Sequence, residues 1–164
     1  MLVMAKGTVA PPLELEGTDG RKYSLKESLE AGPLLAAFFK VTCPTCQFAF
    51  PFVDRLYRQF KDKGATVWGV SQDNARHSRE FARKYDITFP ILVDDYPYRV
   101  SKAYQLKYTP TLFLIRADGE VELASEGFAK RDFVEIHRWL SRQLGLNLPA
   151  LFHSTEPIPE YKPG

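Results

Sequence analysis

The sequence has few cysteines, no long hydrophobic run and little excess charge of either sign. Its 164 residues include two cysteines, too few for the disulfide framework of a small secreted domain. The longest uninterrupted apolar run, Leu34–Phe39, has six residues, whereas a helix that crosses a bilayer needs about 20. Lys and Arg number 22 against 20 Asp and Glu, and the two signs are mixed along the chain. These absences argue against a disulfide-rich or membrane-spanning protein and give nucleic-acid binding no support.

The composition suits one globular domain in the cytoplasm. A length of 164 residues fits a single hydrophobic core, and 45% hydrophobic with 26% charged residues is close to the globular average. Residues 1–12 contain one lysine and lack the apolar stretch of about 7 to 15 residues that a secretory signal requires. We therefore expect a cytoplasmic protein with no membrane partner.

Hydrophobic periodicity predicts one domain of strands and helices over residues 1–145. The strand patterns cover residues 12–15, 21–25, 34–40, 65–71, 89–93, 111–116 and 121–125. The helix patterns cover residues 24–29, 44–62, 74–85, 96–106 and 130–144. The first two strands predict an N-terminal hairpin, and the near-continuous apolar run at 34–40 predicts a central strand that is buried on both faces of a sheet.

Residues 146–164 form a Pro-rich C-terminal tail in this interpretation. The tail carries four prolines, at positions 149, 157, 159 and 163. Such a segment is typically extended or mobile, so we do not expect it to add another element to the core.

The two cysteines lie three positions apart, in Cys43-Pro44-Thr45-Cys46, where the helix pattern 44–62 begins. A disulfide across so short a loop removes little entropy from the unfolded chain, so the pair indicates chemistry rather than a structural staple. A thiolate is the nucleophile in disulfide exchange, and the positive end of a helix stabilises one. Cys43 is the predicted nucleophile, and Cys46 is placed to resolve a mixed disulfide at that sulfur. The redox-active disulfide Cys43–Cys46 then replaces any cofactor.

Two other interpretations of the cysteine pair remain open, although redox activity outweighs both. A zinc site needs four ligands, and only His77, His137 and His153, at scattered positions, are available to complete one. Free cysteines also often behave as small buried hydrophobes, so the pair could be inert. We expect no metal, and no histidine receives a role.

Four features together resemble the thioredoxin fold superfamily, specifically its thioredoxin-like, TlpA and AhpC/TSA-related branch. They are Phe38–Thr42 before the CPTC motif, Pro51 five residues after Cys46, the sequence Tyr108-Thr109-Pro110-Thr111, and Ala117-Asp118-Gly119 after an apolar strand. The resemblance covers residues of about 10 to 144. It implies an α/β fold, namely a thioredoxin-like three-layer sandwich with a central mixed sheet, helices on both faces and an N-terminal β-hairpin extension.

The resemblance also implies a substrate-binding surface around the cysteines. Pro110 would be the family's cis-proline, which presents the backbone of Thr109 beside Cys43, and an extended substrate strand could pair there. The implied substrate-binding residues are Thr42, Pro44, Thr45, Thr109 and Pro110.

Three features depart from thioredoxins proper. Thr42 precedes the first cysteine, where thioredoxins usually have Trp, and Pro44-Thr45 lies between the cysteines, where they usually have Gly-Pro. Ala37 stands where they carry a buried acid, so the proton of Cys46 needs another acceptor, for which Lys40 or water are the candidates.

The predicted function is thiol-disulfide oxidoreduction, with a role in cell redox homeostasis. The expected partners are a disulfide-bearing protein or small thiol substrate and an external reductant or oxidant, with the protein a monomer or weak dimer and no nucleic acid involved. The alternative is a peroxiredoxin-like thiol peroxidase with antioxidant activity. Its motif P-x-x-x-T/S-x-x-C fails, because Ala36 and Lys40 precede Cys43 at the required spacings, and Phe39 and Cys43 precede Cys46. A third hypothesis is a binding module whose Pro-rich tail is the ligand of a partner.

Overall fold

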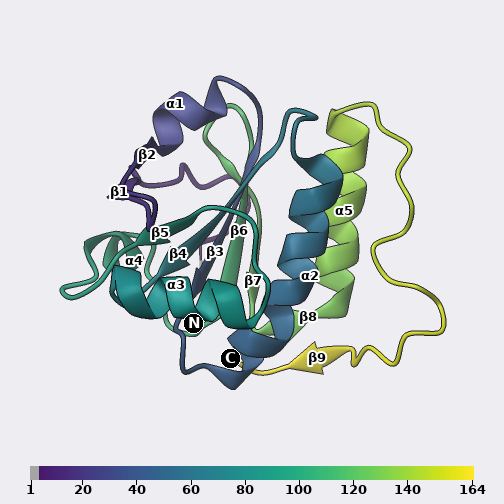
Figure 1. The fold of residues 1–164 in the computed structure, drawn as a ribbon. Helices are drawn as coiled ribbons and strands as arrows, with labels where there is room; N and C mark the ends of the chain where they lie inside the picture. The colour runs from purple at the N-terminus through teal and green to yellow at the C-terminus, as the bar shows by residue number, and fades with distance from the viewer. Residues whose placement is uncertain (1–3) are drawn as a thin grey trace.

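The computed structural model describes residues 4–164 and has a mixed five-stranded sheet at its centre (Figure 1). The strand order is β5–β4–β3–β6–β7. The strands are β3 (Leu34–Phe39), β4 (Thr66–Ser71), β5 (Ile91–Val93), β6 (Thr111–Ile115) and β7 (Val121–Glu126). β3 pairs in parallel with β4 and antiparallel with β6, so it is central, as its apolar run predicted.

Side chains of β3 alternate between two hydrophobic cores, one on each face of the sheet. Leu35, Ala37 and Phe39 face a core shared with α2 (Pro44–Phe60), α3 (Ala75–Lys84) and α5 (Lys130–Gln143). Leu34, Ala36 and Phe38 face a core shared with α1 (Leu25–Leu29) and α4 (Arg99–Ala103). All six side chains are fully buried. The predicted sandwich, with helices on both faces of a mixed sheet, is therefore confirmed.

The predicted N-terminal hairpin is present as a separate two-stranded sheet. Strand β1 (Glu14–Glu16) pairs antiparallel with β2 (Lys22–Ser24). The Ser24 side chain then caps α1 by accepting a hydrogen bond from Glu27 N at 3.4 Å. The turn of the hairpin reaches the edge of the central sheet, where Thr18 N donates to Ile91 O at 2.8 Å.

The helix expected at 96–106 is shorter than the sequence pattern suggested. The structure has α4 at Arg99–Ala103, after Tyr98, whose φ of 60° lies in the left-handed region. An α-helix cannot pass through a residue in that conformation, so the helical part of the segment starts only at Arg99. No helix among residues 4–164 is long and apolar enough to cross a membrane.

The Pro-rich tail is extended but contributes to the core, contrary to our expectation. Leu151 is 5% and Phe152 is 9% exposed, and both belong to the core that α2 and α5 share. The tail then turns back, and β9 (Tyr161–Lys162) pairs antiparallel with β8 (Phe128–Ala129). In Figure 1 the tail, drawn in yellow, passes along the side of the helix pair and ends beside the N-terminal end of α2.

An ion pair that holds the tail on α2 should make stability depend on pH. Arg55 binds both carboxylate oxygens of Glu156, at 2.8 and 2.7 Å, and this pairing lowers the pKa of Glu156 from its usual 4.5 to about 2. A depressed carboxyl pKa stabilises the fold above the unfolded value, and that contribution is lost as pH falls through the folded one. We expect Glu156→Gln to lower the free energy of unfolding at pH 7 and to have a much smaller effect near pH 2. Denaturant titrations at both pH values measure this, and an equal loss at both would contradict it.

Candidate active site

Cys43 is the N-cap residue of α2, and its sulfur receives a hydrogen bond from the helix. Its backbone is extended, with φ −80° and ψ 115°, and Cys46 N donates to Cys43 Sγ at 3.1 Å. Pro44 follows at the first helical position, where its fixed φ suits the helix and its missing N–H is not needed. The sulfur thus lies at the positive end of a 17-residue helix.

Thr109 and Pro110 meet the cysteines because of the sheet topology. β3 and β6 are antiparallel neighbours, so the end of β3, which leads to Cys43, lies beside the start of β6. The Thr109–Pro110 peptide bond is cis. The Cys43 thiol lies 3.3 Å from Thr109 O and donates to it. The predicted position of Thr109 beside Cys43 is therefore confirmed.

The two cysteines differ in their access to solvent, and Cys46 is the more buried. Cys43 is partly exposed, whereas Cys46 is 0% exposed. Burial raises the pKa of the Cys46 thiol, and its hydrogen bond with Cys43 raises it further, which outweighs the lowering by the Lys40 backbone. Of the two sulfurs, Cys43 is the one that an external disulfide can reach.

The loop before Cys43 is held by two side chains that the sequence reasoning missed. Asp73 Oδ2 accepts a hydrogen bond from Val41 N at 2.8 Å, and Gln47 Nε2 donates to Val41 O at 3.0 Å. Asp73 follows β4, and Gln47 lies in the first turn of α2. Residues from these two elements therefore hold the backbone of the loop at Val41. The only sequence signal for Asp73 is that it follows a buried strand.

The other predicted site residues surround the sulfur in different ways. Thr42 and Pro44 are exposed. Thr45 is half-buried, and its Oγ1 donates to Pro163 O of the tail at 2.6 Å. Ala37 is fully buried and offers no proton acceptor, while the side chain of Lys40 is exposed to solvent.

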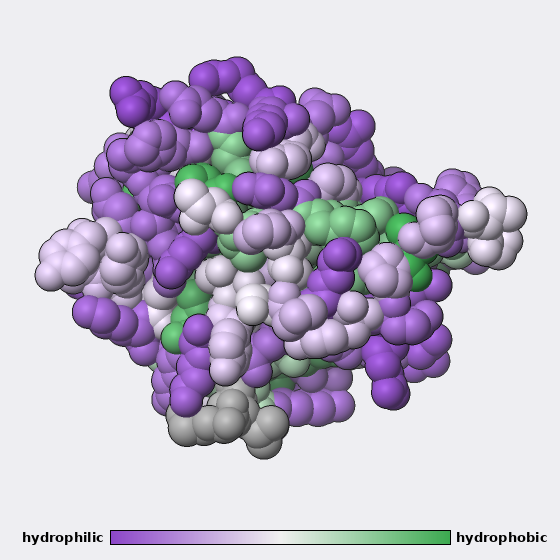
Figure 2. All heavy atoms as spheres, turned by 90° about the horizontal axis from the view of Figure 1, so that it is seen from below, coloured by the Kyte–Doolittle hydropathy of each residue, from purple (hydrophilic) through white to green (hydrophobic). Residues whose placement is uncertain are grey.

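The surface at this end of the molecule combines apolar and hydrophilic side chains (Figure 2). Figure 2 shows the face from below, with side chains of intermediate or high hydropathy near its centre and hydrophilic ones around them. A hollow of about 250 Å³ adjoins Thr109, and its lining includes Lys40, Gln72, Tyr98 and Tyr108. No residue of the tail (146–164) lines this hollow.

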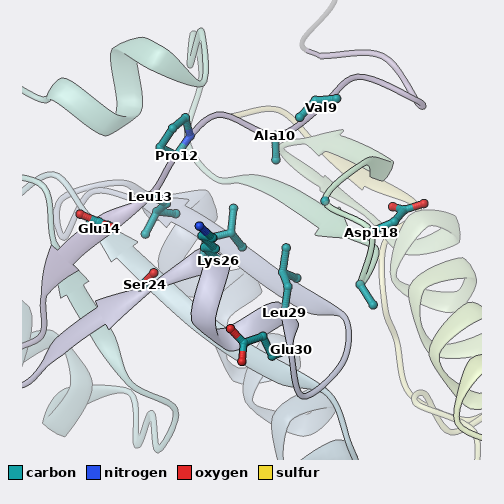
Figure 3. A pocket seen from close by; sticks show the side chains of 13 residues that line it. Val9, Ala10, Pro12, Leu13, Glu14, Ser24, Lys26, Leu29, Glu30 and Asp118 are labelled. Carbon is teal, nitrogen blue, oxygen red and sulfur yellow. The ribbon is translucent and has the colours of Figure 1, made fainter.

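A larger pocket lies away from the cysteines. It has a volume of about 440 Å³ and is formed by residues 9–14, α1 and the turn 117–119 (Figure 3). Leu13, Leu25 and Leu29 give it an apolar lining, and Lys26, Glu30 and Asp118 lie around it. Neither cysteine lines this pocket, so it is not part of the redox site.

The histidines that could have completed a zinc site have other positions. His137 pairs with Gln59 Oε1 at 2.7 Å between α5 and α2, and burial lowers its pKa. His77 lies 3.1 Å from the Arg76 guanidinium on α3. Within residues 4–164, no three His, Cys, Asp or Glu side chains are grouped so that they could hold a metal ion.

Comparison with known proteins connects this site to disulfide chemistry. The model of the AhpC/TSA family matches residues 6–124. Among curated proteins, the thiol-disulfide oxidoreductase ResA of Geobacillus kaustophilus is 30% identical over 135 residues, which cover 82% of this chain and 76% of that protein.

Solved structures support the fold. A putative thiol:disulfide interchange protein DsbE from Chlorobium tepidum superposes with a TM-score of 0.77 at 26% identity, covering 87% of this chain and 99% of that one. The peroxidoxin BcpB from Mycobacterium tuberculosis gives a TM-score of 0.72 at 22% identity, covering 85% and 97%. The second similarity shows the shared fold alone, whereas the first protein is also named for thiol:disulfide interchange.

Proposed function

This chain belongs to the AhpC/TSA family and is a thiol-disulfide oxidoreductase, and we propose that Cys43 is its nucleophile and Cys46 its resolving cysteine. The observation that carries the proposal is the position of Cys43 Sγ, between Cys46 N at 3.1 Å and Thr109 O at 3.3 Å, at the start of α2. The amide favours the thiolate, and the Thr109 backbone lies where a substrate chain would align.

The proposed exchange proceeds in two balanced steps. The Cys43 thiolate attacks one sulfur of a client disulfide, the client S–S bond breaks, and the second client sulfur leaves as a thiolate that takes up a proton. Cys46 then loses its proton to water and attacks Cys43 Sγ, which forms the Cys43–Cys46 disulfide and releases the second client thiol. The client gains two electrons and the cysteine pair loses two. An external dithiol restores the reduced pair, and the reverse sequence oxidises a client dithiol.

Replacement of the resolving cysteine should trap the first intermediate. We expect reduced Cys46→Ser to accumulate a mixed disulfide through Cys43 with an oxidised peptide or protein, because serine cannot attack the mixed disulfide. Non-reducing electrophoresis and intact mass would detect it. Cys43→Ser is the matched control and should trap nothing. Adduct formation through Cys46 instead would reverse the two roles.

A thiol peroxidase is the second candidate, favoured by the family itself and by the partial exposure of Cys43. In that reaction Cys43 reduces a hydroperoxide, becomes a sulfenic acid and condenses with Cys46, with loss of water. Ala36 and Lys40 occupy the positions of the Pro and Thr/Ser of the peroxidase motif, which disfavours it. Rapid stoichiometric consumption of hydrogen peroxide by the reduced protein would establish antioxidant activity.

Several properties of the protein remain predictions from the sequence. They are a cytoplasmic location, a monomer or weak dimer, reliance on the Cys43–Cys46 disulfide without a cofactor, and the division into residues 1–145 and a tail of 146–164. The relatives named for disulfide exchange support a disulfide-bearing client. The roles of Thr42, Pro44, Thr45, Thr109 and Pro110 in client binding are part of this proposal.

A further inference from the structure

The end of the Pro-rich tail lies on the surface that the proposed function assigns to the client. Thr45, inside the CPTC motif, donates from Oγ1 to Pro163 O at 2.6 Å. Gly164 lies against Thr109: a Cβ atom added to Gly164 would fall only 2.6 Å from Thr109 O. Residues 161–164, which we call the tail tip, therefore contact Thr45, which lies between the two cysteines, and Thr109, which accepts a hydrogen bond from Cys43.

The tail tip is bound through its backbone, as an extended peptide would be. β9 pairs with β8, and Lys130 N next to that pair donates to Glu160 O at 3.0 Å. Added strands of this kind gain affinity from main-chain hydrogen bonds. The Lys162 ammonium lies 5.1 Å from the centre of the Phe48 ring on α2. The strip between β8 and the start of α2 thus accepts an extended chain.

Two glycines permit the close approach of the backbones. A Cβ atom on Gly127 would fall 2.5 Å from Lys162 O, and Gly127 has a φ of 72°, which favours glycine. Gly164 is equally close to the Thr109 carbonyl. A side chain at either position would displace the tail tip, so the contact depends on residues at both ends of the strip.

The tail tip is tethered at a separate point. Phe152 packs in the core, and Arg55 holds Glu156 and also donates to Leu151 O at 3.2 Å. These contacts keep the middle of the tail on α2 when the tip is released. Because the tail tip is tethered, its local concentration at this surface is high. It can therefore compete strongly with a bound client even if its own contacts are weak.

We propose that the tail tip competes with clients for the strip between β8 and the start of α2, which we call the client strip. The clients are disulfide-bearing polypeptides that bind there in an extended conformation. This inference rests on the proposed function. A polypeptide client must displace Pro163 and Gly164 to align with Thr109, whereas a small disulfide reaches the partly exposed Cys43 with the tip in place. The tip therefore slows reaction with polypeptides and selects for those that bind the strip well.

The test compares two disulfides that release the same chromogenic thiolate. One is 5,5′-dithiobis(2-nitrobenzoate), and the other is an unstructured peptide whose single cysteine carries the thionitrobenzoate group. Single-turnover rates are measured on the reduced full chain and on Gly164→Val, whose side chain would clash with Thr109 O. The matched control is Ser154→Val, at an exposed position of the tail away from the site.

We expect Gly164→Val to react about three- to tenfold faster with the peptide disulfide, the factor that corresponds to one net hydrogen bond. The rate with the small disulfide should change less than about twofold, and Ser154→Val should match the wild type with both. Amide hydrogen exchange at Lys130, which donates to Glu160 O, reports whether the tip has lifted. A synthetic peptide of residues 157–164 should slow the variant's reaction with the peptide disulfide only.

The outcomes separate the two proposals. If neither disulfide reacts with the wild type through Cys43, the proposed function fails. If both disulfides react, and Gly164→Val releases the tail tip but leaves the rate with the peptide disulfide unchanged or lowers it, the competitor proposal is overturned. If Gly164→Val leaves exchange at Lys130 unchanged, deletion of residues 161–164 removes the tail tip without changing any residue assigned to client binding. A ratio of peptide rate to small-disulfide rate that stays at the wild-type value in that truncated variant, with no inhibition by the synthetic peptide, also overturns it.

Discussion

Cys43→Ser is expected to lose at least about a thousandfold of the disulfide-exchange rate while the protein stays folded. An alcohol oxygen does not exchange with disulfides, because thiolate chemistry is required. Cys46 cannot take over, since it is 0% exposed and burial raises the pKa of its thiol. Both its access to a client and its fraction of thiolate are therefore low.

The substitution isolates chemistry from folding. Cys43 is the N-cap of α2 and accepts a hydrogen bond from Cys46 N, and serine is among the best N-cap residues. The serine oxygen should keep that hydrogen bond, so the free energy of unfolding should stay close to that of the wild type. Denaturant titration is the control, and insulin reduction by dithiothreitol with catalytic amounts of protein is the activity measurement. Retention of more than a tenth of the wild-type rate would assign the first attack to another group.

The site was predictable where local chemistry decides its structure. Proline at the first helical position and cysteine at the N-cap fix the conformation of Cys43-Pro44 from adjacent residues alone, and the structure has them there. The fully apolar run of β3 predicted a central strand. Contact between Cys43 and Thr109, 66 residues apart, came from resemblance to a family, because no periodicity specifies which strands become neighbours.

The parts that the sequence did not predict depend on distant partners. β8 and β9 have two residues each, too short for an alternation of apolar and polar residues to be recognised. The Asp73 carboxylate accepts a hydrogen bond from Val41 N, just after the neighbouring strand β3, and no local pattern indicates that contact. Tyr98 adopts a left-handed conformation that no general preference of tyrosine indicates. In each case tertiary contacts outweigh the local pattern.

The tail is the clearest case of a segment whose tertiary contacts its local sequence pattern did not predict. Its four prolines indicated an extended segment, which is correct, but the apolar pair Leu151-Phe152 was a signal of core packing that the proline content obscured. The Phe152 ring lies 5.3 Å from the Phe52 ring and 6.3 Å from the Phe133 ring. A segment without regular secondary structure can therefore complete the core between two helices.

Phe152→Ala should consequently lower the free energy of unfolding by about 3 kcal/mol, the lower end for truncation of a buried Phe, because its ring is 9% exposed. For a chain of this size the melting temperature should fall by about 6 to 12 °C. Val134→Ala, at a 37% exposed position on α5, is the control and should change stability by less than about 0.5 kcal/mol. Urea titration followed by circular dichroism measures both variants.

The result for Phe152→Ala also bears on how the tail tip is held. If the tail is part of the cooperative core, the unfolding transition stays single and shifts to lower denaturant. A loss below about 1 kcal/mol would instead mean that residues 146–164 detach before the core unfolds. The tether that keeps the tip near Cys43 would then be weaker than the packing of Phe152 indicates, and the competition at the client strip would fall with it.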